Sequence, residues 1–168
     1  MEDTIETACN QYLSFVMADE AYAIPVSKIR EVLTVPKLTF VPRMPPFMRG
    51  IINVRGSAVP VTDLRKKFGM DETVIGTLTA IIIVEIPCDD RGAGCVRNIG
   101  VLADSVRKVI TILPGEIEPP PRIGNRISTS FITGMGHTEN DFIVILDIGM
   151  VLSADELSLL QEANIPDE

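Results

Sequence analysis

Two short apolar segments separated by a two-residue turn constrain the fold most strongly. Ile51–Val54 and Ser57–Val61 predict two strands, and Arg55-Gly56 lies between them. A two-residue hairpin turn needs positive φ angles, which glycine adopts without steric cost. The sequence therefore predicts a tight β-hairpin that buries its apolar side chains and displays Arg55 at its tip.

A short helix is expected directly after this hairpin. Thr62 or Asp63 can accept hydrogen bonds from the first backbone N–H groups of a helix over Leu64–Phe68, and Gly69 is a typical residue at a helix end. The whole unit presents one arginine on a rigid scaffold and contains no nucleophile–base pair. It is therefore typical of a contact surface.

Short strands and turns also fill the rest of the chain. About ten strands at close spacing, with little helix, indicate a sandwich or small barrels, because alternating βαβ units would need a helix between strands. The expected strands are Gln11–Met17, Ala21–Pro25, Leu38–Val41, Ile51–Val54, Ser57–Val61, Thr79–Ile86, Ile99–Ala103, Ser105–Ile112, Ile127–Met135 and Phe142–Asp147.

The segments between these strands receive simpler predictions. We expect a helical turn or a bend at Ser27–Leu33, and a proline-rich crossover at Pro114–Pro121. Residues 1–9 are expected to form a flexible leader, Pro87–Asn98 a polar loop, and residues 153–163 a C-terminal helix.

Composition narrows the class of protein. A chain of 168 residues with 46% hydrophobic residues can bury the core of one domain, or of two small subdomains that share a core. The net charge of −8 argues against non-specific binding to nucleic acid. No apolar run approaches the length of a membrane span, and no secretory signal is visible. Three cysteines fit reduced thiols, so we expect a cytoplasmic protein without membrane insertion.

The charges are unevenly distributed along the chain. Nine of the fifteen Lys and Arg residues lie between Lys28 and Lys67, where only Glu31 and Asp63 are acidic. This segment carries about +7, and the remainder of the chain carries about −15. The basic residues are either solvated strand edges and helix faces or a positive face for an acidic protein partner.

The residue types that carry enzyme chemistry are sparse. His137 is the only histidine, and a lone histidine in a loop pattern is usually inert. Cys88 and Cys95 have six residues between them and no second pair, unlike the spacing of zinc ligands. The Gly134–Gly136 segment lacks the following helix of a nucleotide-binding fingerprint. We therefore expect no catalytic site, no metal site and no cofactor.

A series of segments in a fixed order points to one family. In chain order they are Gln11–Phe15, Tyr22–Val26, Lys28–Val32, Pro45–Gly50, Asn53–Gly56, Val59–Arg65, Gly100–Val106 and Ser128–Gly136. Any one of these segments is a weak signal, but together they resemble CheW, the coupling protein of bacterial chemotaxis, over almost the whole chain.

The resemblance implies an all-β fold with short helices, built as two small five-stranded β-barrels of SH3 or OB type that share a hydrophobic core. Residues 10–150 would form a single CheW-like domain. Its first subdomain would cover about residues 18–88, and its second about residues 10–17 together with 96–150. The first strand would thus belong to the second barrel.

The resemblance also implies a function without enzymatic activity. Proteins of this family bind the cytoplasmic tip of methyl-accepting chemoreceptors and the regulatory domain of the histidine kinase CheA, and this bridge places the kinase under receptor control. The chain would accordingly be recruited to receptor arrays at the inner face of the membrane. Neither a fused receiver nor a kinase segment is visible, which separates the chain from the CheV type and from CheA itself.

Site residues follow from the matching motifs. Arg55 is the first candidate for receptor docking, with Ile29 and Glu31 as further candidates, and Asn53 is expected to fix the turn. Arg122 and Ile123 fall where the family makes its kinase and array contact, although Ile123 can equally be a core residue.

Two alternatives stay open at the level of sequence. The chain can serve another chemosensory pathway, such as surface motility or second-messenger control. It can also be an OB-like nucleic-acid-binding module, which would need exposed aromatic side chains beside a basic groove. With no Trp and two Tyr in the chain, such aromatic side chains are few.

Overall fold

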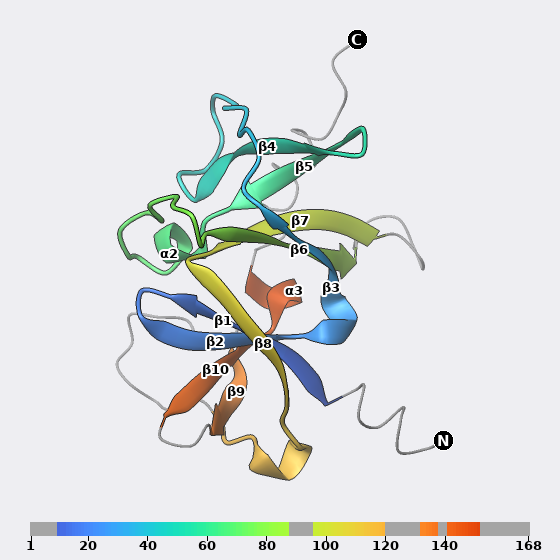
Figure 1. The fold of residues 1–168 in the computed structure, drawn as a ribbon, viewed down its shortest axis with the longest axis vertical. Helices are drawn as coiled ribbons and strands as arrows, with labels where there is room; N and C mark the ends of the chain where they lie inside the picture. Colours follow the sequence, from blue (N-terminus) through green and yellow to red (C-terminus); the bar gives the residue numbers. More distant parts are fainter. Residues whose placement is uncertain (1–9, 88–95, 120–131, 138–140, 152–168) are drawn as a thin grey trace.

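The computed structural model describes residues 10–87, 96–119, 132–137 and 141–151, which form two five-stranded sheets stacked on one another (Figure 1). One sheet has the strand order β8-β1-β2-β10-β9 and the other has the order β3-β6-β7-β5-β4. The strands are β1 Gln11–Met17, β2 Glu20–Pro25, β3 Ile29–Thr34, β4 Met48–Val54, β5 Ser57–Thr62, β6 Ala80–Pro87, β7 Val96–Ala103, β8 Ser105–Thr111, β9 Ile132–His137 and β10 Phe142–Leu146.

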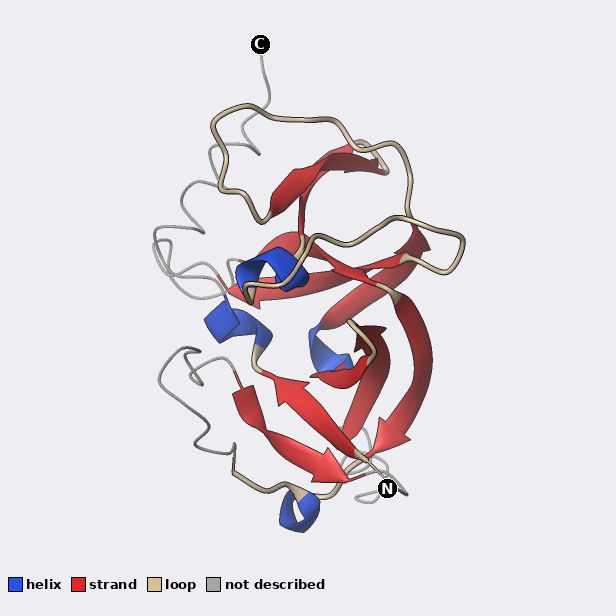
Figure 2. Ribbon diagram, turned by 90° about the vertical axis from the view of Figure 1, so that its left-hand side faces the viewer, coloured by secondary structure: helices blue, strands red, loops and turns tan. Residues whose placement is uncertain are grey.

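Helices in the described residues are short, of one turn or little more, among the much longer strands (Figure 2). They are the 3-10 helices Val26–Lys28 and Pro114–Glu116 and the α-helices α2 Leu64–Lys67 and α3 Ile148–Val151. The prediction of an all-β protein with short helices is therefore confirmed.

Closed barrels are absent from the described residues, which corrects the predicted architecture. In the second sheet β3 and β4 stay at opposite ends of the hydrogen-bonded order. Residues 35–47 connect these strands and contain four prolines, which cannot donate to a ladder. The connection contributes one isolated bridge, Thr39 to Ile51, where a strand over Leu38–Val41 was expected.

At the edge of the first sheet, a proline-rich segment likewise makes an isolated bridge to the edge strand β9. Between β8 and β9, the described part of the proline-rich crossover makes one isolated bridge, Glu118 to Met135. Gly134 lies beneath this crossover, and an added Cβ there would sit 2.6 Å from the Glu118 carbonyl oxygen. The described part of the crossover therefore packs closely against β9 at Gly134.

The segment Ser27–Leu33 is mostly a strand, so the predicted helical turn or bend is wrong beyond Lys28. A 3-10 turn covers Val26–Lys28, and β3 then pairs antiparallel with β6 from Ile29 onward. β-Branched residues such as Ile29 and Val32 favour this extended pairing. The helix expected at residues 153–163 and the leader at residues 1–9 lie outside the described residues, whereas α3 lies just before the expected helix.

The chain changes sheet twice. β1 and β2 form a hairpin in the sheet that the C-terminal strands complete, and β2 pairs in parallel with β10 through Tyr22 and Val144. The sequence-based boundary at about residue 18 assigns β2 to the other subdomain, whereas the strands place the first crossing between Pro25 and Ile29. The second crossing is at Asp104, between β7 and β8.

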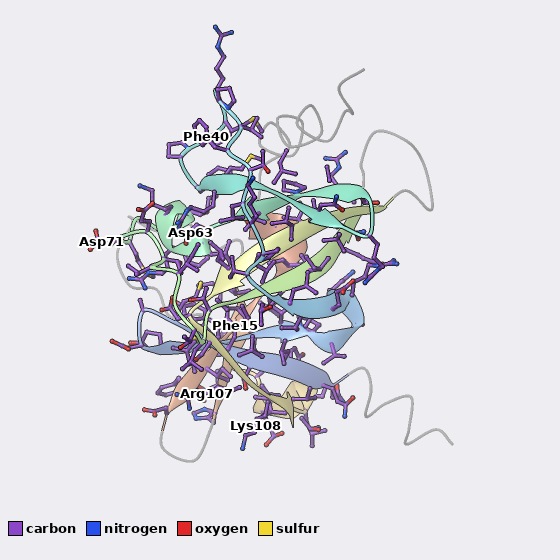
Figure 3. All side chains as sticks on the ribbon, turned by 45° about the horizontal axis from the view of Figure 1, so that its top comes forward. Phe15, Phe40, Asp63, Asp71, Arg107 and Lys108 are labelled. Atoms are coloured by element: carbon purple, nitrogen blue, oxygen red, sulfur yellow. The ribbon has the colours of Figure 1, made fainter. Side chains whose placement is uncertain are left out.

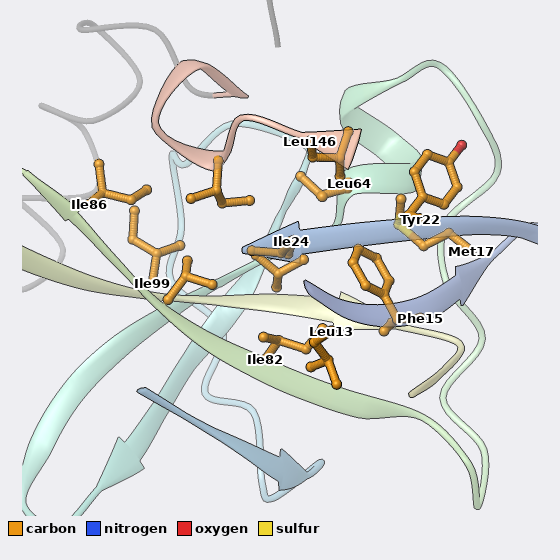
Figure 4. Close-up of a cluster of buried hydrophobic side chains, with 14 of the residues drawn as sticks. Leu13, Phe15, Met17, Tyr22, Ile24, Leu64, Ile82, Ile86, Ile99 and Leu146 are labelled. Atoms are coloured by element: carbon orange, nitrogen blue, oxygen red, sulfur yellow. The ribbon is translucent and has the colours of Figure 1, made fainter. Parts of the chain in front are cut away.

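A large hydrophobic cluster lies between the two sheets and joins them (Figure 4). β1 and β2 contribute Phe15 and Ile24, while β6 and β7 contribute Ile82 and Ile99, all at most 1% exposed. The strongly apolar β6 has Ile81 to Val84 buried on both faces, as its β-branched run predicts. One core is therefore shared by both sheets.

Candidate functional site

The turn between β4 and β5 presents Arg55 as expected from the sequence. Arg55 and Gly56 have φ angles of 50° and 88°, the combination that a two-residue hairpin turn requires. The Asn53 side-chain oxygen accepts a hydrogen bond from the Gly56 N–H at 2.8 Å. Asn53 thus closes the turn, and the Arg55 side chain stays 72% exposed.

Arg55 has an intramolecular partner, Glu31 on β3. Its two terminal guanidinium nitrogens donate to the two carboxylate oxygens of Glu31, one of them at 3.2 Å. The hydrogen bond to Glu31, followed by the charge attraction, raises the pKa of Arg55 above its ordinary value. The arginine is therefore charged throughout the physiological pH range, and the carboxylate orients its planar fork.

This ion pair joins the two edges of one sheet. β3 and β4 lie at opposite ends of the strand order β3-β6-β7-β5-β4, yet Glu31 and Arg55 meet. The sheet must therefore curl until its edges approach. A second hydrophobic cluster of Ile52, Val59, Ile81 and Leu102 fills the concave side, with Leu33 and Val54 packed against it.

The structure brings three of the predicted site residues together and places a fourth beside the core. Asn53, Arg55 and Glu31 form one polar group at the edge of the curled sheet, in which Asn53 and Arg55 are exposed and Glu31 is partly buried. Ile29 begins β3 and is partly buried against the large cluster between the sheets, so only part of its side chain is accessible. Arg122 and Ile123 lie outside the described residues.

A buried network behind the hairpin was only partly foreseen. Asp63 caps α2, as one of the two candidates, by accepting the Arg65 N–H at 3.1 Å. Its carboxylate also accepts the Thr73 N–H and hydroxyl, each at 2.8 Å, and the Arg49 guanidinium at 3.0 Å. The Asp63 side chain is fully buried. A cap signal exists in the sequence, but no spacing rule points to Thr73 ten residues later.

The basic segment is partly neutralised from within the fold. Arg30, Arg49, Arg55 and Arg65 each pair with a carboxylate, namely Glu85, Asp63, Glu31 and Asp104 in that order. Two of these carboxylates, Glu85 and Asp104, come from outside the segment Lys28–Lys67. Any positive face must therefore rest on the remaining basic residues of the segment, among them the exposed Lys37, Arg43 and Lys66.

His137 is placed in a setting that suits packing. It ends β9, its ring lies 4.7 Å from the ring of Phe142, and its Nε2 lies 3.1 Å from a Glu118 oxygen. Within the described ranges, no group of three or more His, Cys, Asp or Glu residues could hold a metal ion. Cys88 and Cys95 lie outside those ranges.

Helices in the described part of the chain are all too short to cross a membrane, and none carries a long apolar stretch.

Comparisons with known proteins agree over most of the chain. A family model described as the CheW-like domain matches residues 11–156. The chemotaxis protein CheW of Bacillus subtilis is 30% identical over 154 residues, which are 92% of this chain and 91% of that protein. The chemotaxis protein CheW of Klebsiella aerogenes is 28% identical over 155 residues, covering 92% and 89%.

A solved structure gives the same result for the fold. The crystal structure of the scaffolding protein TtCheW from Thermoanaerobacter tengcongensis superposes with a TM-score of 0.75 and 33% sequence identity, covering 88% of this chain and 90% of that chain. The family model thus spans β1 to the last described helix, the fold agrees over most of the chain, and the chain belongs to the CheW-like domain family.

Proposed function

We propose that this protein is a non-enzymatic adaptor of chemotaxis, which couples the cytoplasmic tips of chemoreceptors to the histidine kinase CheA. The protein acts in the cytoplasm and is recruited to receptor arrays at the inner face of the membrane. The observation that carries the proposal is the match to chemotaxis and scaffolding relatives over about nine-tenths of both chains.

The receptor docks at the polar group formed by Arg55, Glu31 and Asn53, of which Arg55 is the most accessible part. An arginine held at the tip of a rigid turn loses little conformational freedom on binding and can make charge-assisted hydrogen bonds. Arginine is also frequent among the residues that dominate binding free energy. The accessible part of Ile29, at the start of β3, adds an apolar contact beside this group.

The kinase docks through Arg122 and Ile123, which are not among the residues proposed for the receptor. An adaptor that uses different residues for its two partners can hold both at once. No reaction is needed for this task, and the buried network of Asp63 has a cap and packing role in place of a catalytic one.

The test is co-sedimentation of the purified protein with membranes that carry receptor tips, in the presence and absence of a CheA regulatory domain. Wild type should bridge both partners. Arg55→Ala should lose receptor binding and keep kinase binding, because the turn-tip side chain adds little to the fold. Lys66→Ala, which removes an exposed cation from α2, is the matched control and should behave as wild type.

The proposal fails if wild type sediments with neither partner. It also fails at the level of the site if Arg55→Ala, shown to be folded by circular dichroism, retains full receptor affinity.

A further inference from the structure

Two donors from segments far apart in the sequence meet at the carboxylate of Asp104, where the chain crosses from one sheet to the other. The Asp104 Oδ2 accepts a hydrogen bond from the Ala18 N–H at 2.9 Å and another from Arg65 Nη1 at 3.0 Å. The Asp104 N–H donates to the Val16 carbonyl oxygen at 2.9 Å, and Arg65 Nε donates to the Asp71 carbonyl oxygen at 3.0 Å. We call Arg65, Asp104 and the Ala18 N–H the clasp.

The clasp joins the two sheets through side chains and not only through the chain crossing. Ala18 lies in the turn of the β1–β2 hairpin, which belongs to one sheet. Arg65 lies on α2, which directly follows β5 of the other sheet. Figure 1 shows α2 beside the turned end of the β1–β2 hairpin, next to the point where β7 passes into β8.

The geometry of the β1–β2 turn indicates that the clasp holds it in place. Ala18 has a φ angle of 51° and Asp19 has one of 66°. Alanine in this left-handed region is disfavoured by its Cβ, and such a conformation persists where the surrounding structure determines it. The hydrogen bond from the Ala18 N–H to Asp104 supplies that constraint.

The ion pair is also shielded from solvent. The side chains of Arg65 and Asp104 are 21% and 27% exposed, whereas those of the surface pair Arg30–Glu85 are 52% and 33% exposed. A partly buried pair is screened less by salt and water than an exposed one. The pair at Asp104 is therefore the better suited to hold a fixed geometry.

The shared core alone does not set the angle between the sheets. Burial of the large cluster is favourable because apolar area leaves water, and that force has no preferred direction. Hydrogen bonds and charge-assisted pairs do have a preferred direction. A directional contact at one end of the interface can therefore select one orientation among those that the core permits.

We propose that the clasp of Arg65, Asp104 and the Ala18 N–H fixes the orientation of the two sheets relative to each other, and that Arg65 is a positioning residue for the bridge between receptor and kinase. The second half rests on the proposed function, because the Arg55 turn lies on one sheet and the kinase surface is assigned to the half of the chain that forms the other. A fixed angle between the sheets then fixes the angle between the two partners.

The test measures the distance between the sheets in the protein alone. Spin labels are placed at Ala58→Cys on β5 and Thr133→Cys on β9, two exposed positions on different sheets, with the three native cysteines replaced by serine. Double electron–electron resonance then gives the distribution of label distances. Arg65→Gln removes the charge pair, and Arg30→Gln is the matched control because Arg30 and Glu85 lie on the same sheet.

A single narrow distribution is expected for wild type and for Arg30→Gln. For Arg65→Gln we expect a broader distribution with a shifted maximum. If Arg65→Gln is unfolded, Asp104→Asn replaces it, because the amide oxygen can still accept the Ala18 N–H while the charge is lost. A folded Arg65→Gln or Asp104→Asn with the wild-type distribution overturns the proposal.

A bridging assay with receptor tips and the CheA regulatory domain then tests the functional half. Arg65→Gln should bind each partner separately as wild type does, and should lose the ternary complex. A broadened distribution with wild-type bridging overturns the role of Arg65 in positioning. If wild type binds neither partner while Arg65→Gln still broadens the distribution, the clasp is supported and the proposed function is refuted.

Discussion

Arg55 donates to both carboxylate oxygens of Glu31, so the tip of the β4–β5 hairpin is attached to β3 at the far edge of the same sheet. Two residues that the sequence suggests as separate receptor contacts are thus each other's partners. A receptor group that binds Arg55 must either share the guanidinium with Glu31 or displace it. The exposed fork of Arg55 leaves donors available for sharing.

Reversing the pair separates its structural role from its binding role. Arg55→Glu alone places two carboxylates opposite each other and should lower the melting temperature slightly. Adding Glu31→Arg restores opposite charges and should recover that temperature, but receptor affinity should stay as low as in Arg55→Ala. Thermal unfolding and co-sedimentation are the measurements. Full recovery of receptor affinity in the double variant would show that the receptor recognises the pair and not the position of the arginine.

Removing the buried carboxylate of Asp63 should be severe. Asp63→Ala removes the buried acceptor of the Thr73 N–H and hydroxyl, and it removes the charge partner of Arg49, which retains the Thr73 carbonyl oxygen as an acceptor. Breaking a buried pair on one side lowers the free energy of unfolding by about 3–5 kcal/mol. Urea unfolding at neutral pH measures this, with Glu72→Ala as the control, because Glu72 is 62% exposed and lies 4.0 Å from Arg49. Equal stability of the two variants would contradict the stabilising role of the buried Asp63 carboxylate.

Gly134 should tolerate no side chain, for steric reasons. A Cβ at this position would lie 2.5 Å from Ile117 Cγ2 and 2.6 Å from the Glu118 carbonyl oxygen. The crossover would have to move off β9, and we expect Gly134→Ala to cost about 1–3 kcal/mol of unfolding free energy. Gly76→Ala is the matched control, since a Cβ added there would meet nothing within 4 Å. Thermal unfolding of both variants measures this cost. A Gly134→Ala variant as stable as wild type would mean that the crossover does not pack against β9.

Alkaline pH should destabilise the fold through Tyr22. Burial, and then the charge of Glu20, raise the pKa of Tyr22 above its ordinary value, and its ring packs 5.9 Å from that of Phe15 (Figure 4). Well below about pH 10 the hydroxyl is protonated in both states, so Tyr22 adds no pH dependence there. Above about pH 10 the unfolded chain loses the proton first, the folded state binds more protons, and the unfolding free energy falls as pH rises.

Tyr22→Phe should therefore show a shallower loss of stability between pH 9 and pH 11, about the range that spans the ordinary tyrosine pKa. Urea midpoints across this range measure the slope. An identical slope in both proteins would mean that other groups cause the alkaline loss.

Local chemistry explains which parts of the fold could be predicted from the sequence. The Arg55-Gly56 turn, the Asp63 cap and the buried β6 depend on residues within a few positions of one another, and all three are present. Strand pairing between distant segments leaves no such local signal. The predicted turn at Ser27–Leu33 failed for this reason, because pairing with β6 draws Ile29–Thr34 into a strand.

The candidate site also has a part that local sequence predicts and a part that depends on contacts between distant segments. Arg55, Glu31, Asn53 and Ile29 were selected by motif, and the contact between Arg55 and Glu31 depends on how far the sheet curls. The carboxylates of one short segment also differ in their surroundings. Figure 3 shows Asp71 at the outer edge of the molecule and Asp63 nearer its middle, although the two are close in sequence.

The clasp is a further contact that the sequence alone could not predict. Ala18, Arg65 and Asp104 are separated by dozens of residues and belong to no common motif, yet their polar groups meet at one carboxylate. Only the fold decides which charges meet.

The parallel pairing of β2 with β10 has a consequence for synthesis on the ribosome. Tyr22 and Ala23 find their partners at Val144 and Ile145, more than a hundred residues later. The N-terminal hairpin therefore leaves the exit tunnel long before its sheet can be completed. The apolar face of β1 and β2 stays uncovered until the C-terminal strands of the sheet have been synthesised. Closure over such a sequence separation is slow compared with local pairing. A nascent chain that stalls before β10 would present an unfinished edge, which is the form most exposed to chaperones and to aggregation.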